Sequence, residues 1–192
     1  YVGDNIYPSG VTSTADAQFQ TKFEIPYAAL NYPFYMILGN HDYDNTYDLV
    51  RAQAQVDYTA YSTRWVMPDR TYTLTTGDVT IIGIDTQEID QGFGAAQEPW
   101  IANELANATT TWKLVMGHHP YISNGMHGNA GTYDGHVGQG VNVENFISTY
   151  VCGQADVYFC GHDHNLQWLE PTCGTEFIVS GAAAGGNPLV GT

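Results

Sequence analysis

The stretch Ala155-Asp156-Val157-Tyr158-Phe159-Cys160-Gly161-His162-Asp163-His164 joins a strand to the residues that directly follow it. The run 155–160 is rich in apolar and aromatic residues and predicts a buried strand. Gly161 ends the run, and glycine allows a sharp turn and a close approach of the backbone to a ligand. His162 and His164 are two positions apart, so both can face one cavity from an extended turn. The stretch therefore predicts a strand with a polar site at its carboxyl end.

Three further segments repeat this order of strand, glycine and polar side chains. They are Gly3-Asp4-Asn5-Ile6-Tyr7 after Tyr1-Val2, Gly39-Asn40-His41-Asp42 after the run 33–38, and Gly117-His118-His119-Pro120 after the run 112–116. Because the carboxyl ends of strands line the ligand crevice of open α/β sheets, we expect these turns to converge. The seven histidines lie in these turns or in the glycine-rich segment 123–140: His41, His118, His119, His127, His136, His162 and His164.

The rest of the chain predicts a layered α/β domain. Strands at 71–75 and 79–84 are expected to form a hairpin around Thr76-Gly77-Asp78, and a last strand is expected at 177–179. Apolar residues at three-and-four spacing predict helices at 15–27, 47–56, 98–106 and 143–150. We find no internal repeat or linker, so residues 1–192 are interpreted as one domain. The segment 123–140 is long for a plain connection and is expected to be a site loop.

Composition narrows the class of protein. Lys and Arg number 5 against 20 Asp and Glu, giving a formal net charge of −15, which argues against nucleic acid and anionic membranes as partners. No apolar run reaches the roughly 18 to 20 residues that a membrane span needs, so no membrane insertion is expected. A bound metal can invert the local field, so a phosphorylated small molecule or a phosphoprotein stays possible as a substrate.

The cysteines give an indication of the cellular compartment in which the protein functions. Cys160 belongs to a predicted strand, where a buried thiol needs no further role. Cys152 and Cys173 flank that strand in loop-like surroundings, where they either close a loop as a disulfide or stay reduced. We predict that they pair. With the sequon Asn107-Ala108-Thr109 and an acidic, lysine-poor composition, this favours a secreted protein, or one in a periplasmic or lysosome-like compartment.

The chemistry of the polar side chains predicts metal binding. Any one of these histidines alone is more simply a structural residue, but random placement would also scatter histidines over the helices. Carboxylate, amide, phenol and imidazole groups without a thiolate suit iron, manganese or zinc. Asp4 and Tyr7 are three positions apart and can face one cavity from a tight turn. The donors exceed what one ion requires, which indicates two metals with Asp4 shared.

The ordered motifs Gly-Asp-x-x-Tyr, Gly-Asn-His-Asp, Gly-His-x-Pro and Gly-His-x-His resemble those of the calcineurin-like metallophosphoesterases. Within that superfamily the chain is most similar to the purple acid phosphatases of the small, tartrate-resistant type. The resemblance runs from Gly3 to about Gly186, and Tyr7 narrows it to the purple branch, since Ser/Thr phosphatases of this fold usually have Asp there. It implies an α/β (α+β) fold: a four-layer β-sandwich of two mixed sheets flanked by helices, with the site at the strand ends.

The resemblance also implies roles for individual residues. Tyr7 and His164 would bind a ferric ion, Asn40, His118 and His162 would bind a divalent iron, zinc or manganese ion, and Asp4 would bridge the two. His41 and His127, together with Asn40, would bind the substrate phosphate, and the two histidines would help to protonate the leaving oxygen. His127 is assigned from its position nine residues after His118.

Two positions depart from the family pattern. The first family motif, a strand that ends in an Asp of the ferric site, should precede Gly3 and is absent, so the N-terminal strand is expected to be missing. His119 stands where the small acid phosphatases usually have an aromatic residue, and we expect it to face solvent.

The function implied is that of an acid phosphatase, which hydrolyses phosphate monoesters with a metal-bound hydroxide at a dinuclear Fe(III)–M(II) centre. Two alternatives stay open: a phosphodiesterase or nucleotide phosphoesterase with the same site, and a non-catalytic structural or binding domain that kept the fold.

Overall fold

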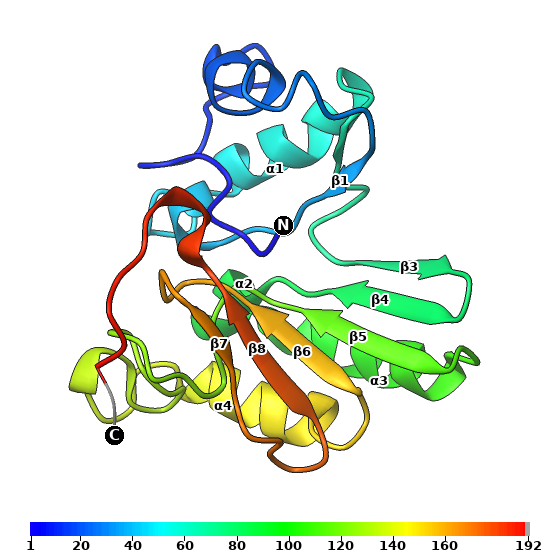
Figure 1. Cartoon of the computed structure of the whole chain (residues 1–192), viewed down its shortest axis with the longest axis vertical. Coiled ribbons are helices and arrows are strands. Elements are labelled where there is room, and N and C mark those ends of the chain that lie inside the picture. Colours follow the sequence, from blue (N-terminus) through cyan, green and yellow to red (C-terminus); the bar gives the residue numbers. More distant parts are fainter. Residues whose placement is uncertain (191–192) are drawn as a thin grey trace.

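The computed structural model describes residues 1–190. Its central element is a mixed six-stranded sheet in the order β3-β4-β5-β6-β8-β7 (Figure 1). The four central strands are parallel, and β3 and β7 pair antiparallel at the two edges. The bounds are Tyr72–Thr76 for β3, Val79–Gly83 for β4, Trp112–Met116 for β5, Val157–Cys160 for β6, Leu166–Trp168 for β7 and Glu176–Ser180 for β8.

Three helices cover one face of this sheet (Figure 1). They are α2 (Thr86–Asp90), α3 (Gln97–Asn107) and α4 (Val141–Phe146), and α4 continues into a π-helical turn over Ile147–Val151. Ile82, Val115 and Tyr158 are fully buried beneath them, at alternate positions of their strands, because successive strand side chains point to opposite faces. In the part of the chain that the structure describes, no helix combines the length and the apolar character needed to cross a bilayer.

The opposite face of the sheet is less covered. Ile81, Leu114 and Phe159 lie on it, are only partly buried, and line a cavity of about 690 Å³. The remaining strands, β1 (Phe34–Tyr35) and β2 (Trp65–Val66), have two residues each and pair only with each other. Residues 1–190 therefore form a mixed sheet flanked by helices, and the second full sheet of the expected sandwich is not formed within them.

The N-terminal third has its own core and lies beside the sheet (Figure 1). Phe19 stacks on Tyr58 with ring centroids 3.6 Å apart and meets Trp65 edge-on at 5.2 Å. Around these rings lie a π-helix over Gln20–Glu24, 3-10 turns over Asn40–Tyr43 and Tyr58–Ala60, and α1 over Leu49–Asp57. This packing holds two of the predicted polar turns, those of residues 3–7 and 39–42, against the end of the sheet.

Most predicted elements are confirmed, and the misses have local causes. The hairpin 71–84, the strand 112–116 and the helix 98–106 lie where they were predicted. The predicted helix 15–27 forms only a short π-helix, and the predicted strand 33–38 pairs over two residues before it continues as extended, buried chain. The sequence did not indicate α2 and β7, because elements of five and three residues are too short to show a periodicity.

The predicted disulfide is confirmed. Cys152 and Cys173 are bonded with their Cα atoms 5.4 Å apart, and Cys160 is a free, buried thiol. The bridge joins residues 21 positions apart and encloses β6.

We predict that replacing Cys152 and Cys173 together by Ser lowers the free energy of unfolding by about 3 kcal/mol, because the bridge restricts the unfolded chain. Urea unfolding of the variant and of reduced wild-type protein should give the same lower value. Thiol labelling of the denatured, unreduced protein should find one free cysteine. A reductant that leaves the unfolding curve unchanged would contradict the prediction.

Candidate metal centre

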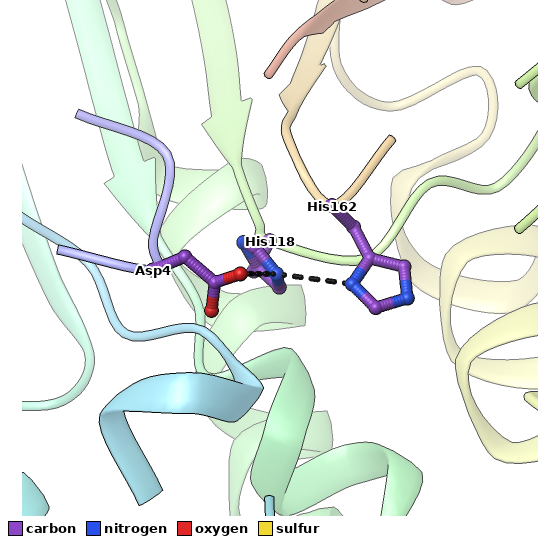
Figure 2. A group of neighbouring side chains, drawn as sticks. All are labelled: Asp4, His118 and His162. Carbon is purple, nitrogen blue, oxygen red and sulfur yellow. Dashed lines mark hydrogen bonds and ion pairs between the residues drawn. The ribbon is translucent and has the colours of Figure 1, made fainter. Parts of the chain in front are cut away.

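The structure brings all six predicted ligand residues together at the carboxyl ends of β5 and β6. Asn40 Oδ1 lies 3.0 Å from His118 Nε2 and 3.1 Å from His162 Nδ1. The two ring nitrogens are 3.2 Å apart, and His118 Nε2 is 3.4 Å from Asp4 Oδ2. Figure 2 shows Asp4, His118 and His162 in a row, their polar atoms directed toward one another. We call Asn40, His118 and His162 the imidazole group.

A second set of donor atoms shares the same carboxylate. The Tyr7 hydroxyl lies 2.6 Å from Asp4 Oδ2 and 2.9 Å from His164 Nε2. We call Tyr7 and His164 the phenol group. Asp4 Oδ2 is therefore next to both groups, and the sharing of Asp4 by two metals stays a prediction.

The turns that carry these side chains are strained or need glycine. Gly3 has a φ of +86°, and a Cβ there would lie 2.5 Å from His118 Nδ1, so the close approach requires glycine. Asp4 and His162 have φ values of 55° and 62°, in the left-handed region that residues with a Cβ avoid. Such conformations cost about 1–3 kcal/mol each and concentrate at functional sites.

The imidazole group fits a cation. His118 Nδ1 donates a hydrogen bond to the Val2 carbonyl at 2.8 Å, which leaves Nε2 to hold either a proton or a metal ion. The Asn40 amide donates from Nδ2 to Asn45 Oδ1 at 2.6 Å, so its oxygen faces the imidazoles. Burial and the neighbouring imidazoles lower the pKa of His162 well below its usual range, which keeps this ring neutral. Without a metal, a proton on His118 Nε2 supplies positive charge here, since burial is outweighed by the Asp4 carboxylate, which raises the pKa of His118. A metal ion would displace that proton.

The phenol group offers oxygen and nitrogen donors to a cation. Burial, then the nearby carboxylate of Asp4, raises the pKa of Tyr7, so its phenolate needs a strong cation beside it. Burial opposes ionisation of Asp4, but the charge of His118 and hydrogen bonds from His118 and Tyr7 outweigh it, so the pKa of Asp4 lies below its usual range. Carboxylate, phenol and imidazole donors without a thiolate suit iron better than a soft ion.

His41 and His127 flank the cluster and do not belong to it. The His41 ring lies against Tyr7 with centroids 4.2 Å apart, and its Nδ1 is 2.7 Å from the Pro8 carbonyl. The His127 ring lies against His162 at 4.0 Å, and its Nδ1 is 2.8 Å from Asp134 Oδ1. The two predicted substrate-binding histidines thus border the two donor groups, one each.

The expectation that His119 faces solvent is wrong. His119 is buried, and its Nδ1 lies 2.9 Å from Thr86 Oγ1. That hydroxyl accepts from the backbone N–H of His118 at 3.1 Å and of His119 at 3.0 Å, so its own hydrogen is directed to His119 Nδ1. Burial, then the charge of His118, lowers the pKa of His119 well below its usual range. The ring is therefore neutral and carries its hydrogen on Nε2.

Asp42 lies in the motif Gly39-Asn40-His41-Asp42, and the sequence did not indicate its role. Its buried carboxylate accepts from the backbone N–H groups of Asn5 at 3.1 Å, Ile6 at 3.2 Å and Gly39 at 2.9 Å. The Gln55 amide adds a fourth bond at 3.0 Å. Asp42 thus ties the turn that carries Asp4 to the turn that carries Asn40. A carboxylate three residues after a strand-ending glycine was the available signal.

Comparison with known proteins identifies the family to which the chain belongs. The family model of the calcineurin-like phosphoesterases matches residues 1–166, and the chain belongs to that family. Within it, the chain is similar to tartrate-resistant acid phosphatase type 5 of Mus musculus, with 32% identity over 98% of this chain and 61% of that protein. It is 30% identical to purple acid phosphatase 3 of Arabidopsis thaliana, over 95% of this chain and 52% of that protein.

Two solved structures show the same fold at low identity. GAP50, the anchor in the inner membrane complex of Plasmodium, superposes with a TM-score of 0.69 at 19% identity, over 96% of this chain and 61% of its own. PhoD gives 0.57 at 16% identity, over 94% and 50%. The chain thus spans 61% or less of the length of these relatives.

We predict that Asp42→Asn lowers the free energy of unfolding by about 2–4 kcal/mol, because the new amide N–H₂ faces backbone N–H groups and loses bonds to a buried charge. Asp44→Asn is the matched control. Asp44 is partly exposed and lies 3.7 Å from Arg51, so its loss should cost less than about 1 kcal/mol. Urea unfolding measures both. Equal losses in the two variants would contradict a structural role for Asp42.

Proposed function

We propose that this chain is a metal-dependent acid phosphatase that hydrolyses phosphate monoesters. The observation that carries the proposal is the position of Asp4 Oδ2, 2.6 Å from the Tyr7 hydroxyl and 3.4 Å from His118 Nε2. A single carboxylate within reach of two donor groups is suited to bridge two cations. The relatives named as acid phosphatases support the same reaction class at about 30% identity.

The residues present fit a dinuclear centre. Fe(III) would be held by Tyr7, His164 and Asp4, and Fe(II), Zn(II) or Mn(II) by Asn40, His118, His162 and Asp4. When bound, such ions supply the positive charge that holds a phosphate and makes water a stronger acid. That charge would also allow a chain with a formal net charge of −15 to accept an anionic substrate.

The flanking histidines would handle the phosphate and the proton. His41 Nδ1 is hydrogen-bonded to the Pro8 carbonyl, and His127 Nδ1 is hydrogen-bonded to Asp134. Among residues 1–190, the Nε2 atom of neither ring has a hydrogen-bond partner. Each Nε2 can bind a phosphate oxygen, and when protonated it can pass a proton to the leaving oxygen. Stacking on Tyr7 and His162 keeps the two rings beside the donor groups.

We further propose that residues 1–192 act as one metallophosphoesterase domain in an oxidising compartment, whether secreted, periplasmic or lysosome-like. The disulfide between Cys152 and Cys173 supports this, since such bonds persist outside the reducing cytosol. Substrates would be phosphorylated small molecules or phosphoproteins, and the acidic composition argues against nucleic acid.

We predict that the metal-loaded protein is violet and releases phosphate from phenyl phosphate at mildly acidic pH. Tyr7→Phe should abolish the visible band, because it removes the phenolate, yet lower activity less than Asp4→Ala does. Asp4→Ala should lower both the metal content and the activity, because it removes the donor common to both groups. Metal analysis, visible absorption and phosphate release give the three readouts. Tyr61→Phe changes an exposed tyrosine and should alter none of them.

Other outcomes separate the alternatives. A colourless, iron-free protein that still hydrolyses phenyl phosphate would keep the metallophosphoesterase function and reject the ferric site. Hydrolysis of bis-aryl phosphate in preference to phenyl phosphate would identify a diesterase. A protein that binds no metal and releases no phosphate would be a non-catalytic domain.

A further inference from the structure

A cavity of about 430 Å³ opens beside the imidazole group, away from the phenol group. Asn40 and His162 form its inner end, and the segment 123–140 contributes Tyr133, Asp134 and Gln139 to its wall. α2 and the residue after it complete the lining with Gln87, Asp90 and Gln91. We call this space the amide cavity. Because the amide cavity borders the candidate metal centre at Asn40 and His162, it offers space to a leaving group on a phosphate bound there.

The amide cavity carries carboxylates and amides, and its histidines, His119 and His162, are neutral; among residues 1–190 no Lys or Arg lines it. Asp90 and Asp134 contribute carboxylates, and five other lining residues contribute amides: Asn40, Asn45, Gln87, Gln91 and Gln139. The five Lys and Arg side chains are engaged elsewhere: Lys22 with the Tyr7 carbonyl, Arg51 with Asp48, Arg64 with Glu24, Arg70 with Glu88 and Lys113 with the Leu105 carbonyl. A second anionic group on a substrate would therefore find no counter-charge here.

Two buried polar side chains point to a ligand that forms hydrogen bonds. Gln87 is 2% exposed, and among residues 1–190 its amide has no hydrogen-bond partner, although it lines the cavity. His119 is 4% exposed and also lines the cavity, with its Nε2–H unpartnered in the same range of residues because Thr86 occupies Nδ1. These polar atoms are accessible from the cavity and have no protein partner in residues 1–190, so hydroxyl groups of a bound molecule can pair with them.

An aromatic ring adds the surface that such a molecule needs. Tyr133 is buried against the cavity, and its hydroxyl donates to the Pro120 carbonyl at 2.5 Å. With that hydroxyl engaged, the residue offers ring carbons to the carbon skeleton of a ligand. Amides, a carboxylate and an aromatic ring together complement a polyol, which has hydroxyl groups on a short apolar skeleton.

We infer that the amide cavity receives an uncharged, hydroxyl-rich leaving group, so that the substrates are polyol or sugar monophosphates. Gln87 and Asp90 would bind the hydroxyl groups, and the carboxylate of Asp90 would repel esters that carry a second negative charge. This inference rests on the proposed phosphatase function and names its substrate class.

The test compares the kcat/KM values of the metal-loaded protein for two phosphate esters that differ at one group. Glycerol 3-phosphate and 3-phosphoglycerate share a three-carbon skeleton, but the first ends in CH₂OH and the second in a carboxylate. Burial raises the pKa of Asp90, so kcat/KM is compared over a series of rising pH values, along which the carboxyl ionises. We expect kcat/KM to be about tenfold higher for glycerol 3-phosphate, as expected for one added charge near a carboxylate.

Three variants locate the effect. Asp90→Asn should lower the ratio of kcat/KM for glycerol 3-phosphate to kcat/KM for 3-phosphoglycerate below about threefold, because the substitution removes the charge and keeps the shape of the side chain. Gln87→Leu should lower kcat/KM for glycerol 3-phosphate but not for phenyl phosphate, which has no hydroxyl to bind. Asp78→Asn removes an exposed carboxylate at the β3–β4 turn and should leave the ratio unchanged. Dissociation constants of the two matching phosphonates, measured by calorimetry, should show the same preference without turnover.

The failures are distinguishable. One outcome is that phenyl phosphate is hydrolysed but kcat/KM for 3-phosphoglycerate or phosphoethanolamine equals or exceeds that for glycerol 3-phosphate. The proposed substrate class is then wrong and the phosphatase function stands. If no ester is hydrolysed, the proposed function fails. Separately, if the two phosphonates bind with equal affinity or do not bind, the inference about the substrate class is overturned.

Discussion

The buried carboxylate of Asp42 is the constraint on which the site depends. It accepts hydrogen bonds from the backbone of Asn5, Ile6 and Gly39, and so joins two turns that are more than thirty residues apart in the chain. Those turns carry Asp4 and Asn40, which belong to the cluster at the end of the sheet. Without a buried acceptor between them, three backbone N–H groups would lose their partners, and the donor atoms would lose their spacing.

The site that results is unfavourable without a cation. Asn40 and His162 direct acceptor atoms toward His118 Nε2, while Asp4 and His162 adopt backbone conformations that a Cβ disfavours. The stability of the surrounding fold has to offset these terms, and packed clusters on both sides of the site supply it. A metal ion would attract all of these donor atoms at once and would displace the proton of His118, which is the physical reason to interpret the cluster as a metal centre.

The distribution of charge around the centre bears on the substrate. The basic side chains are engaged in contacts away from the amide cavity, so attraction for a phosphate has to come from the proposed metals and the flanking histidines. Beyond the phosphate, the cavity offers amides, carboxylates and the buried donor of His119. An acidic protein of this kind can therefore favour one anionic group and disfavour a second.

The sequence by itself determined the central strands, the turns that follow them and the six residues that converge, because strand-ending glycines followed by polar side chains are local patterns. Only the tertiary structure decided the burial of His119 and the role of Asp42. Both depend on partners distant in sequence, Thr86 for the first and the 3–7 turn for the second, and no local periodicity records them. The same holds for the uncovered sheet face, since a continuous apolar strand marks both faces as apolar but does not say what packs on them.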